Sequence, residues 1–319
     1  MPFASSCNSA VRRGQPVTNH VAVDEASVQN RALGAFLGLA VGDALGTTLE
    51  FSPKPDRPVL HDIIGGGPFR LEPGAWTDDC SMALALADSL ITNPDLDAID
   101  LMKRFVSWYR DGRYSHTGVC FDIGNTTLDA IQTFEANGKA FAGSTDPRTA
   151  GNGSIMRLAP VAVRHWNDRP RLIRIAGDQS RTTHAAVEAV ACCETLAEIL
   201  ADAIGGWSLP KLLTRPSVQQ VRGFEIGQHR HHVRGTGYVV ASLHAALWAV
   251  SRTSSFADAV LLAANLGEDA DTTAAVAGQI AGAIYGVSGI PTEWLDHLVW
   301  KDEIRHKAET LFRASLAVA

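Results

Sequence analysis

The sequence predicts a single, mainly α-helical domain. Apolar residues recur at intervals of three and four along most of the chain, which is the spacing of one face of an α-helix. Strand signals are scarce: only short pieces such as residues 59–64 suit an extended strand, and no strand–helix alternation points to a parallel sheet. A length of 319 residues allows one or two domains, and we interpret the helical pattern as one.

The first predicted helix follows a stretch without clear periodicity. Residues 1–28 are rich in Ser, Asn, Gly and Pro, and we assign residues 1–30 to an N-terminal extension and residues 31–319 to the folded domain. Apolar residues then follow helical spacing, and four glycines share one face of the helix: Gly34, Gly38, Gly42 and Gly46. Glycines at every fourth position allow a second helix to approach closely.

Further helices are predicted in order along the rest of the chain. The helix at 272–286 is lined by small residues, so we place it in the middle of the domain. Loops rich in Gly and Pro separate the helices at residues 52–76, 111–121, 137–155 and 205–236. The predicted helices span residues 79–91, 98–110, 123–136, 170–178, 184–204, 238–250, 255–265, 272–286 and 293–316.

Composition and charge narrow the class of protein. Hydrophobic residues make up 46% of the chain and charged residues 19%, as in an ordinary globular protein, and the net charge of −6 argues against a nucleic-acid-binding protein. Cys192 and Cys193 are adjacent within a helical pattern, and no cysteine pair has metal-site spacing, so we expect free thiols in a reducing cytoplasm. Because Asp43 interrupts the glycine-faced helix and no signal-peptide pattern is present, no membrane association is expected.

Two acid-rich turns, far apart in the sequence, are its most informative feature. Each precedes an Ala-rich helical run, so each is predicted at a helix N-terminus, where carboxylates can point outward together. The turns offer only oxygen donors, which favours Mg²⁺, Mn²⁺ or Ca²⁺ over Zn²⁺. Alternatively Asp79 and Asp271 only cap their helices, although a cap needs a single acceptor. The oxygen-bearing side chains are Thr77, Asp78 and Asp79 in the first turn, and Asp269, Asp271 and Thr272 in the second.

Three further polar clusters interrupt apolar surroundings. They are Glu50, directly after the glycine-faced helix, the segment 121–127 around Asp122, and the segment 151–157 around Asn152. Each cluster taken alone is also explained as a helix cap with its turn. Glycines in the second and third clusters permit a backbone that meets a ligand closely, so we expect phosphate or ribose hydroxyls there.

Six motifs, in one order along the chain, resemble the ADP-ribosylglycohydrolase family. This family includes the dinitrogenase reductase-activating glycohydrolase and the ADP-ribosylarginine hydrolases. The resemblance runs from about Arg31 to the C-terminal helix, and the shared order makes it specific. The motifs are residues 39–50, 76–79, 122–126, 151–157, 183–184 and 267–273.

The resemblance implies an all-α, orthogonal multi-helix bundle with a binuclear Mg²⁺ or Mn²⁺ centre in a surface cleft. It assigns metal ligation to Thr77, Asp78, Asp79, Asp269, Asp271 and Thr272. It assigns catalysis to Asp122, Glu50 and Asp269, and leaves open whether Asp122 or Glu50 is the acid or base. It assigns substrate contacts to Gly124, Asn125, Asn152, Gly153, Ser154, His184 and Tyr238, where the match at Tyr238 is loose and His184 equally suits a cap at a helix start.

Two positions depart from the family pattern. Glu268 stands where many relatives have a second glycine, so an additional carboxylate lies beside the metal turn or faces solvent. Cys80 follows the first acidic turn where relatives often have Thr or Ser, and we expect it to pack in the interior, because a thiol is a poor ligand for a hard cation.

The implied activity is hydrolysis of the N-glycosidic bond that joins ADP-ribose to arginine on a modified protein. Serine-linked or free ADP-ribose derivatives are alternatives, because the same metal site suits them. A rival function is that of an immunity protein, which would bind and cover an ADP-ribosyltransferase toxin with residues 1–30 as well as reversing the modification. A terminus without a partner is the other interpretation of that segment.

Overall fold

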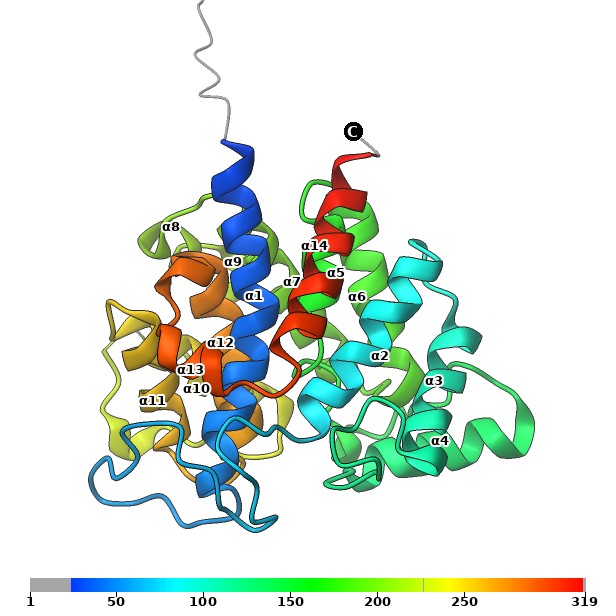
Figure 1. Ribbon diagram of the computed structural model, residues 1–319, viewed down its shortest axis with the longest axis horizontal. Helices are drawn as coiled ribbons and strands as arrows, with labels where there is room; N and C mark the ends of the chain where they lie inside the picture. Colours follow the sequence, from blue (N-terminus) through cyan, green and yellow to red (C-terminus); the bar gives the residue numbers. More distant parts are fainter. Residues whose placement is uncertain (1–23, 226, 318–319) are drawn as a thin grey trace, which may run out of the picture.

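Two long helices, far apart in the sequence, pack antiparallel against each other within the core (Figure 1). The first, α1, spans Glu25–Gly46, and the second, α12, spans Ala270–Tyr285. A Cβ added at Gly34 would lie 2.2 Å from the carbonyl oxygen of Gly282, and Gly46 meets the first residue of α12 in the same way. The predicted close approach of a second helix to the glycine face is confirmed, and α12 is that helix.

The computed structural model describes residues 24–225 and 227–317. Within these ranges the chain forms α-helices, short 3₁₀-helices, turns and isolated β-bridges, so the mainly α-helical prediction is confirmed. The remaining α-helices are α2 (Asp78–Thr92), α3 (Ala98–Asp111), α4 (Asn125–Asn137), α5 (Ala159–His165), α6 (Arg169–Thr183), α7 (Val187–Ile204), α8 (Leu209–Leu213), α9 (Pro216–Gln219), α10 (Val239–Ser251), α11 (Phe256–Ala264), α13 (Thr292–His297) and α14 (Lys301–Leu316). The 3₁₀-helices are η1 (Thr47–Leu49), η2 (Pro147–Thr149), η3 (Arg230–His232) and η4 (Val287–Gly289).

Helix α1 begins earlier than the predicted domain boundary at residue 31. The carboxylate of Asp24 accepts hydrogen bonds from the backbone N–H groups of Ala26 and Ser27, which caps the helix at Glu25. Residues 24–30 of the predicted extension therefore belong to this helix. The rest of that extension, residues 1–23, lies outside the described residues.

The last predicted helix, 293–316, is two helices in the structure. The segment that precedes α2 packs against the chain at the break between α13 and α14. The backbone N–H of Val299 donates to the carbonyl of Gly74, and the indole N–H of Trp76 donates to the carbonyl of Val299. Trp300 adopts the left-handed region with a φ of 59°. These long-range contacts have no local sequence signal, which is why the prediction of one helix was wrong.

Short helices were missed where Pro and Gly dominate the sequence. Helix α5 follows the Gly151–Arg157 segment directly, and α8 and α9 lie within the predicted loop 205–236. All three have Pro in the first turn, a position that Pro tolerates because the first N–H groups of a helix have no intrahelical partner. Helices α8 and α9 bury few residues, Leu212 and Leu213 in α8 and Val218 in α9, whereas every residue of α5 is buried.

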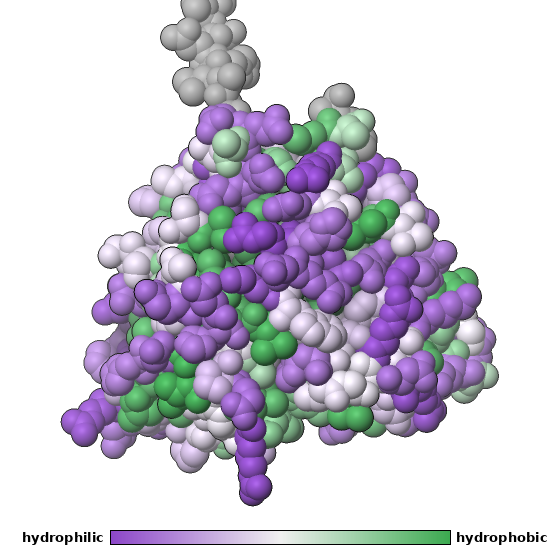
Figure 2. Space-filling model, viewed as in Figure 1, coloured by the Kyte–Doolittle hydropathy of each residue, from purple (hydrophilic) through white to green (hydrophobic). Residues whose placement is uncertain are grey.

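The surface seen in Figure 2 is mostly hydrophilic, with hydrophobic residues in separate small areas. Helix α1 with η1, residues 25–49, is long and apolar enough to cross a membrane by length and composition, but 89% of its most apolar window is buried inside the protein. Its neighbours include α12, α14, α5 and α11. The apolar character of α1 is thus accounted for by its place in the core.

Candidate active site

Three helix ends meet at one acidic cavity of about 420 Å³. The chain leaves α1 through η1 and places Glu50 there, while α2 and α12 direct their N-termini, with Asp78 and Asp271 in their first turns, at the same place. The close contact between α1 and α12 holds these ends together. The cavity is lined by Glu50, Phe51, Asp78, Asp122, Ile123, Gly124, Asn125, Thr126, Thr127, Gly151, Asn152, Gly153, Met156, His184, Gly237, Asp269, Asp271 and Thr272.

Asp43 of α1 caps helix α2 from outside that helix. Its carboxylate accepts hydrogen bonds from the backbone N–H groups of Thr77, at 2.8 Å, and Cys80, at 3.0 Å. Neither N-cap residue, Thr77 of α2 or Asp269 of α12, caps its helix with its own side chain. The alternative that the acidic turns serve only as caps therefore fails, because Asp43 caps α2 and leaves Asp79 free for another role.

The acidic side chains form two groups that share Asp271. Oxygen atoms of Asp43, Asp79 and Asp271 lie within 4.8 Å of one another, and so do those of Glu50, Asp122 and Asp271. The two threonines connect the turns. The hydroxyl of Thr77 lies 3.2 Å from Asp271 Oδ2, and that of Thr272 lies 3.2 Å from Asp79 Oδ1.

Burial raises the pKa of every carboxylate in these groups, and repulsion from neighbouring carboxylates adds to it at all of them except Asp43. Burial, opposed by the hydrogen bonds from Thr77 and Cys80, raises the pKa of Asp43 to about 7. Burial, followed by the charge of Asp271, raises the pKa of Asp269 to about 7 and that of Asp122 to about 9. The pKa values of Glu50, Asp78, Asp79 and Asp271 are raised for the same two reasons. Without a positive charge, the site therefore retains protons at neutral pH.

The donor set fits a hard divalent cation. Two buried carboxylate oxygens, Oδ2 of Asp79 and Oε2 of Glu50, have no hydrogen-bond partner among the described residues. A buried carboxylate oxygen without a donor is costly, and a cation would compensate for it. All of the surrounding groups offer oxygen, which is the ligand atom that Mg²⁺, Mn²⁺ and Ca²⁺ prefer. The fully buried Cys80 packs behind the turn, as expected from the sequence.

Another part of the cavity lining presents hydrogen-bond donors. Helix α4 begins at Asn125, and its N-cap residue Gly124 has no side chain to cap the first turn. The N-terminus of α4 is thus available to an anion, with Thr126 and Thr127 beside it. The amide nitrogen of Asn152 donates to Asp269 Oδ2 at 3.0 Å, which ties the segment around Asn152 to the second acidic turn.

The Gly151–Arg157 segment is anchored from below. The guanidinium of Arg157 is buried and donates to Gln179 and to the hydroxyl of Thr183, both on α6. It leaves Asn152 and Gly153 at the cavity surface. Arg157 therefore positions the segment and makes no contact with the cavity itself.

His184 lines the cavity but does not start a helix. It follows the last residue of α6 in an extended conformation, because its N–H still bonds to Ser180 while Ser144 pairs with it across a β-bridge. Burial, followed by the charge of Arg157, lowers the pKa of His184 to about 3, so the ring is neutral. A Cβ at Gly153 would lie 2.7 Å from the ring, so this position has room only for glycine.

Two residues predicted to contact substrate lie outside the cavity. The side chain of Ser154 is buried, and its hydroxyl bonds to Ser180 and Cys193, because the segment turns inward after Gly153. Tyr238 is part of the neighbouring surface depression, which it forms with Arg148. It is 37% exposed and is the N-cap of α10.

Other predicted residues lie at the cavity or just beneath it. Thr77 and Asp79 are beneath the lining, in contact with Asp271 and Thr272. Glu268, the carboxylate that departs from the family pattern, forms an ion pair with Arg234, so its charge is neutralised by a neighbouring arginine. The remaining predicted residues line the cavity: Glu50, Asp78, Asp122, Gly124, Asn125, Asn152, Gly153, His184, Asp269, Asp271 and Thr272.

Sequence reasoning missed Asp43 and Phe51. A charged residue in the middle of a glycine-faced, apolar helix was a usable signal for Asp43, because such a group needs buried partners. Phe51 is 69% exposed at the cavity, with a left-handed φ of 56°. Its backbone N–H donates to the carbonyl of Glu268 at 2.7 Å, a contact between distant segments that no local pattern indicates.

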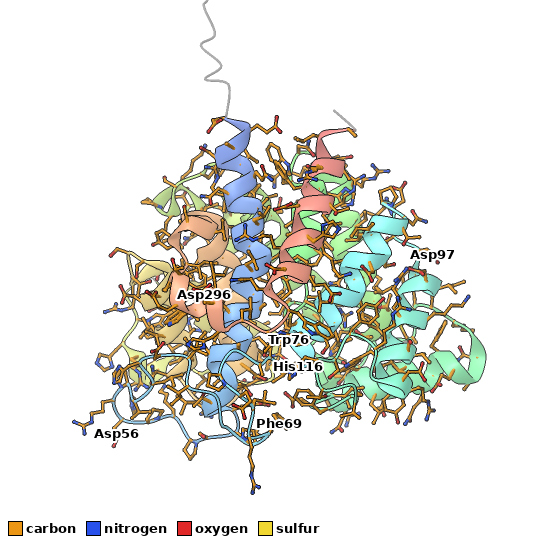
Figure 3. The ribbon with its side chains drawn as sticks, viewed as in Figure 1. Asp56, Phe69, Trp76, Asp97, His116 and Asp296 are labelled. Atoms are coloured by element: carbon orange, nitrogen blue, oxygen red, sulfur yellow. The ribbon has the colours of Figure 1, made fainter. Side chains whose placement is uncertain are left out.

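An aromatic cluster supports the first acidic turn. Trp76, which precedes Thr77, lies beside His116, with ring centroids 4.7 Å apart (Figure 3). The His116 Nε2 is 2.9 Å from the carbonyl oxygen of Trp76. Phe121 extends the cluster from His116 to Phe69. The loops that carry Thr77 and Asp122 are therefore held by the same rings.

Known proteins resemble this chain over almost its whole length. It is 46% identical to the ADP-ribosylarginine hydrolase Tri1 of Serratia proteamaculans. The match extends over 297 residues, which are 91% of this chain and 81% of that protein. The Tri1 hydrolase of Pseudomonas putida is 47% identical over 291 residues, 89% of this chain and 78% of that protein. The ADP-ribosyl-[dinitrogen reductase] glycohydrolase of Rhodospirillum rubrum is 36% identical over 293 residues, 89% and 96% of the two chains.

A solved structure and a family model agree with these relatives. The structure, titled as an ADP-ribosylglycohydrolase-related protein complex, superposes with a TM-score of 0.80 at 41% identity, over 91% of this chain and 99% of that one. The model of the family described as ADP-ribosylglycohydrolase matches residues 24–317. With its fold, its acidic cavity and these likenesses together, the chain belongs to the ADP-ribosylglycohydrolase family.

Proposed function

We propose that this protein is a metal-dependent hydrolase that removes ADP-ribose from modified arginine on proteins. The observation that carries the proposal is the cavity itself, whose lining combines the carboxylates of Glu50, Asp78, Asp122, Asp269 and Asp271 with the open N-terminus of α4. The carboxylates thus suit cations, and the helix N-terminus suits the diphosphate. The names of the two relatives at 46% and 47% identity support arginine as the acceptor residue.

We further propose that the site holds two divalent cations, Mg²⁺ or Mn²⁺. The support is that the buried group around Asp79 and the half-buried group around Asp122 are adjacent and share one carboxylate, that of Asp271. Thr77, Asp78, Asp79, Asp269, Asp271 and Thr272 would hold the pair. When bound, such cations polarise ribose hydroxyls and lower the pKa of a coordinated water.

The hydrogen-bond donors of the cavity hold the substrate. The N–H groups at the start of α4, from Gly124 and Asn125, face the diphosphate, while Asn152 and Gly153 hold the distal ribose. Asn152 also bonds to Asp269, so a ribose placed by Asn152 sits against the acidic turn. The neutral ring of His184 packs at the base of this pocket and excludes water from it.

Asp122 and Glu50 move the proton. In the reaction the oxygen of a water bonds to C1 of the ribose, the bond from C1 to the guanidinium nitrogen breaks, and that nitrogen regains its electron pair. One proton of the water must leave as the C–O bond forms, and one must reach the nitrogen. Oxygen atoms of Asp122 and Glu50 lie within 4.8 Å of each other, and like charges at this distance oppose double ionisation, so the pair keeps a proton to transfer. Both roles therefore remain assigned to the pair.

A direct test uses arginine-, serine- and DNA-linked ADP-ribose as substrates with Mg²⁺, with Mn²⁺ and with EDTA. We expect release of free ADP-ribose and unmodified arginine from the first substrate, with either cation and not with EDTA. Mass spectrometry of the peptide identifies the cleaved bond. Ribose or phosphoribose left on the peptide would mean diphosphate cleavage, and full turnover after dialysis against EDTA would contradict the metal proposal.

A second candidate function is binding of an ADP-ribosyltransferase toxin through the N-terminal extension. The family match begins at residue 24, so residues 1–23 lie outside it. We retain the proposal that this segment contacts a partner in addition to the hydrolase activity. We also propose a reducing, cytoplasmic location, which the free thiols of Cys80, Cys120, Cys192 and Cys193 support.

A further inference from the structure

Glu50 and Asp122 form the proposed acid–base pair, but the fold holds the two residues in different ways. The backbone beside Glu50 is fixed by two hydrogen bonds, from the N–H of Phe51 to the carbonyl of Glu268 and from the N–H of Glu268 to the carbonyl of Ser52, both 2.7 Å long. Residues 120–123, in contrast, form no backbone–backbone hydrogen bond within the described part of the chain. Side chains must therefore hold the segment that carries Asp122.

The backbone of Asp122 makes such support necessary. Its φ is 60°, in the left-handed region that residues other than glycine occupy uncommonly. A conformation of this kind persists where the surrounding structure enforces it. Cys120 and Ile123 pack against the hydrophobic core on either side, and the residue directly before Asp122 is Phe121. The packing of the Phe121 ring therefore bears directly on where the carboxylate of Asp122 lies.

The ring of Phe121 lies between two other aromatic rings. Its centroid is 5.3 Å from that of Phe69, with an interplanar angle of 61°, and 6.0 Å from that of His116, with an angle of 81°. Both pairs are edge-to-face, which is a favoured arrangement for aromatic rings. Phe69 and His116 belong to different loops (Figure 3). His116 also contacts Trp76 beside the first acidic turn, whereas Phe69 contacts Phe121 without touching that turn's tryptophan.

The turn that carries Phe69 is itself fixed to the end of α1. The N–H and carbonyl groups of Gly66 and Leu71 bond to each other in both directions, at 2.7 and 2.9 Å. The hydroxyl of Thr48, in η1, donates to the carbonyl of Gly65 at 3.0 Å. The turn is thus attached to η1, which directly precedes the other member of the acid–base pair. Phe69 therefore connects the fixed side of the pair to the side that lacks backbone hydrogen bonds.

We propose that Phe69 is a positioning residue for hydrolysis: through the ring of Phe121 it holds Asp122 at its distance from Glu50. The proposal rests on the function proposed above for this pair. Phe69 is not among the residues that line the acidic cavity, so it acts through geometry and not through contact with the substrate. Geometry is sufficient for a large effect, because a misplacement of about 1 Å in an active site can reduce the rate about a hundredfold.

Phe69→Leu removes the ring and keeps an apolar side chain. We expect kcat for the release of ADP-ribose to fall by at least about tenfold, with KM changed by less than about twofold, because substrate contacts remain. Phe69→Tyr restores the ring and should keep at least about half of the wild-type kcat. Calorimetric titration with Mn²⁺ should give the same affinity for Phe69→Leu and the wild type. A loss of cation affinity as large as the loss in kcat would overturn the proposal, since it would assign Phe69 to the metal site.

Two further variants test the route through Phe121. If Phe121 transmits the effect, the double variant Phe69→Leu, Phe121→Leu should have a kcat within about twofold of the lower single variant. Losses in kcat that multiply in the double variant would contradict this route. Phe141→Leu is the matched control, because Phe141 is an exposed phenylalanine that does not line the cavity, and it should keep the wild-type kcat.

Crystal structures of the wild type and Phe69→Leu measure the positioning without an activity assay. We expect Asp122 to be displaced or to occupy several conformations in the variant, while Glu50 stays in place. If Asp122 moved but the wild type released no ADP-ribose, the proposed function would fail and the positioning of Asp122 by Phe69 would stand. An Asp122 carboxylate in the same place in both proteins, or an unchanged kcat in Phe69→Leu, would overturn the proposal.

Discussion

Asp271 is the residue on which both acidic groups depend. It lies within 4.8 Å of Asp43 and Asp79 on one side and of Glu50 and Asp122 on the other. Its position in the first turn of α12 could be predicted from the sequence. The carboxylates that surround it are brought there by packing between helices that lie far apart in the chain. The local sequence therefore determines where Asp271 lies on its helix, and the tertiary structure determines which carboxylates it contacts.

Replacing Asp271 by Asn should abolish hydrolysis while the helical fold persists. One anionic donor would be lost to both acidic groups, so we expect kcat/KM to fall by at least about a thousandfold. The gain in melting temperature on adding Mg²⁺ or Mn²⁺ should also shrink. Glu268→Gln is the matched control, because this carboxylate faces Arg234 instead. Near-normal kcat/KM in Asp271→Asn would contradict the assignment.

Phe51 should contribute to substrate binding rather than to chemistry. Its ring is exposed at the cavity beside Glu50, where it can stack on the modified arginine or on a ribose. Phe51→Ala should raise KM about fivefold, the equivalent of about 1 kcal/mol of aromatic contact, with kcat little changed. Ile64→Ala, an exposed apolar residue outside the cavity, is the control. A fall in kcat at constant KM would instead give Phe51 a role in the reaction step.

Among the elements, the α1–α12 pair sets the geometry of the site. Glycine in α1 faces glycine or alanine in α12 from Gly34 to Gly46, and this lets the two backbones touch. The pair ends at the cavity, so its separation determines how far Asp43 and Glu50 lie from Asp271. A structural motif in the core thereby controls the spacing of the acidic side chains at the cavity.

Gly42→Ala tests this control. The added Cβ would lie 2.2 Å from the carbonyl oxygen of Ala274, so the helices must separate. We expect a loss of about 1–3 kcal/mol in the free energy of unfolding and weaker divalent-cation binding. Denaturant titration and calorimetry measure the two effects. Gly205→Ala, at a helix end with ordinary φ, should leave both within error. If Gly42→Ala were destabilised but bound the cation with unchanged affinity, the spacing of the helix pair would not control the geometry of the site.

On the scale of the whole molecule, the clustered carboxylates couple stability to pH. Asp43 and Asp269 have folded pKa values of about 7, above the roughly 3.9 of an unfolded Asp. A raised acid pKa means that the folded state holds protons more tightly. The stability that this contributes is fully present below pH 4 and is lost as the pH rises through 7.

The metal-free protein should therefore melt several degrees lower at pH 8 than at pH 5.5. Added Mg²⁺ or Mn²⁺ should restore more stability at pH 8, because at pH 5.5 protons compete for the same oxygens. Differential scanning calorimetry in EDTA and in cation, at both pH values, measures this. If the cation raised the melting temperature equally at the two pH values, proton–metal competition at these carboxylates would be excluded.

Removal of the N-terminal segment should separate the two proposed functions. Since α1 is capped by Asp24, the deletion must stop at residue 23 to leave the helix intact. Hydrolysis of ADP-ribosyl-arginine should be unchanged, because every proposed metal ligand lies at or beyond Thr77. Affinity for an ADP-ribosyltransferase toxin should fall. Unchanged toxin affinity refutes the partner role, and a parallel loss of hydrolysis and folding assigns the segment to the fold.

Much of the molecule was predictable because its signals are local. The 3.6-residue period located the long helices, and glycines at every fourth position indicated a close helix pair. Errors arose where neighbours in space decide the conformation. The break before Trp300 depends on contacts with Gly74 and Trp76, and the end of α6 at His184 depends on a bridge to Ser144.

The sequence by itself determined the donor chemistry: oxygen ligands in two acidic turns, glycine-flanked donors for an anion, and helices to carry them. Only the tertiary structure decided which groups meet. It placed Asp43 as the cap of α2, directed Ser154 inward and left Phe51 at the cavity. The reason is that a residue type and its immediate neighbours specify backbone direction and hydrogen-bonding capacity. Distances between segments far apart in the chain are set by how their helices pack.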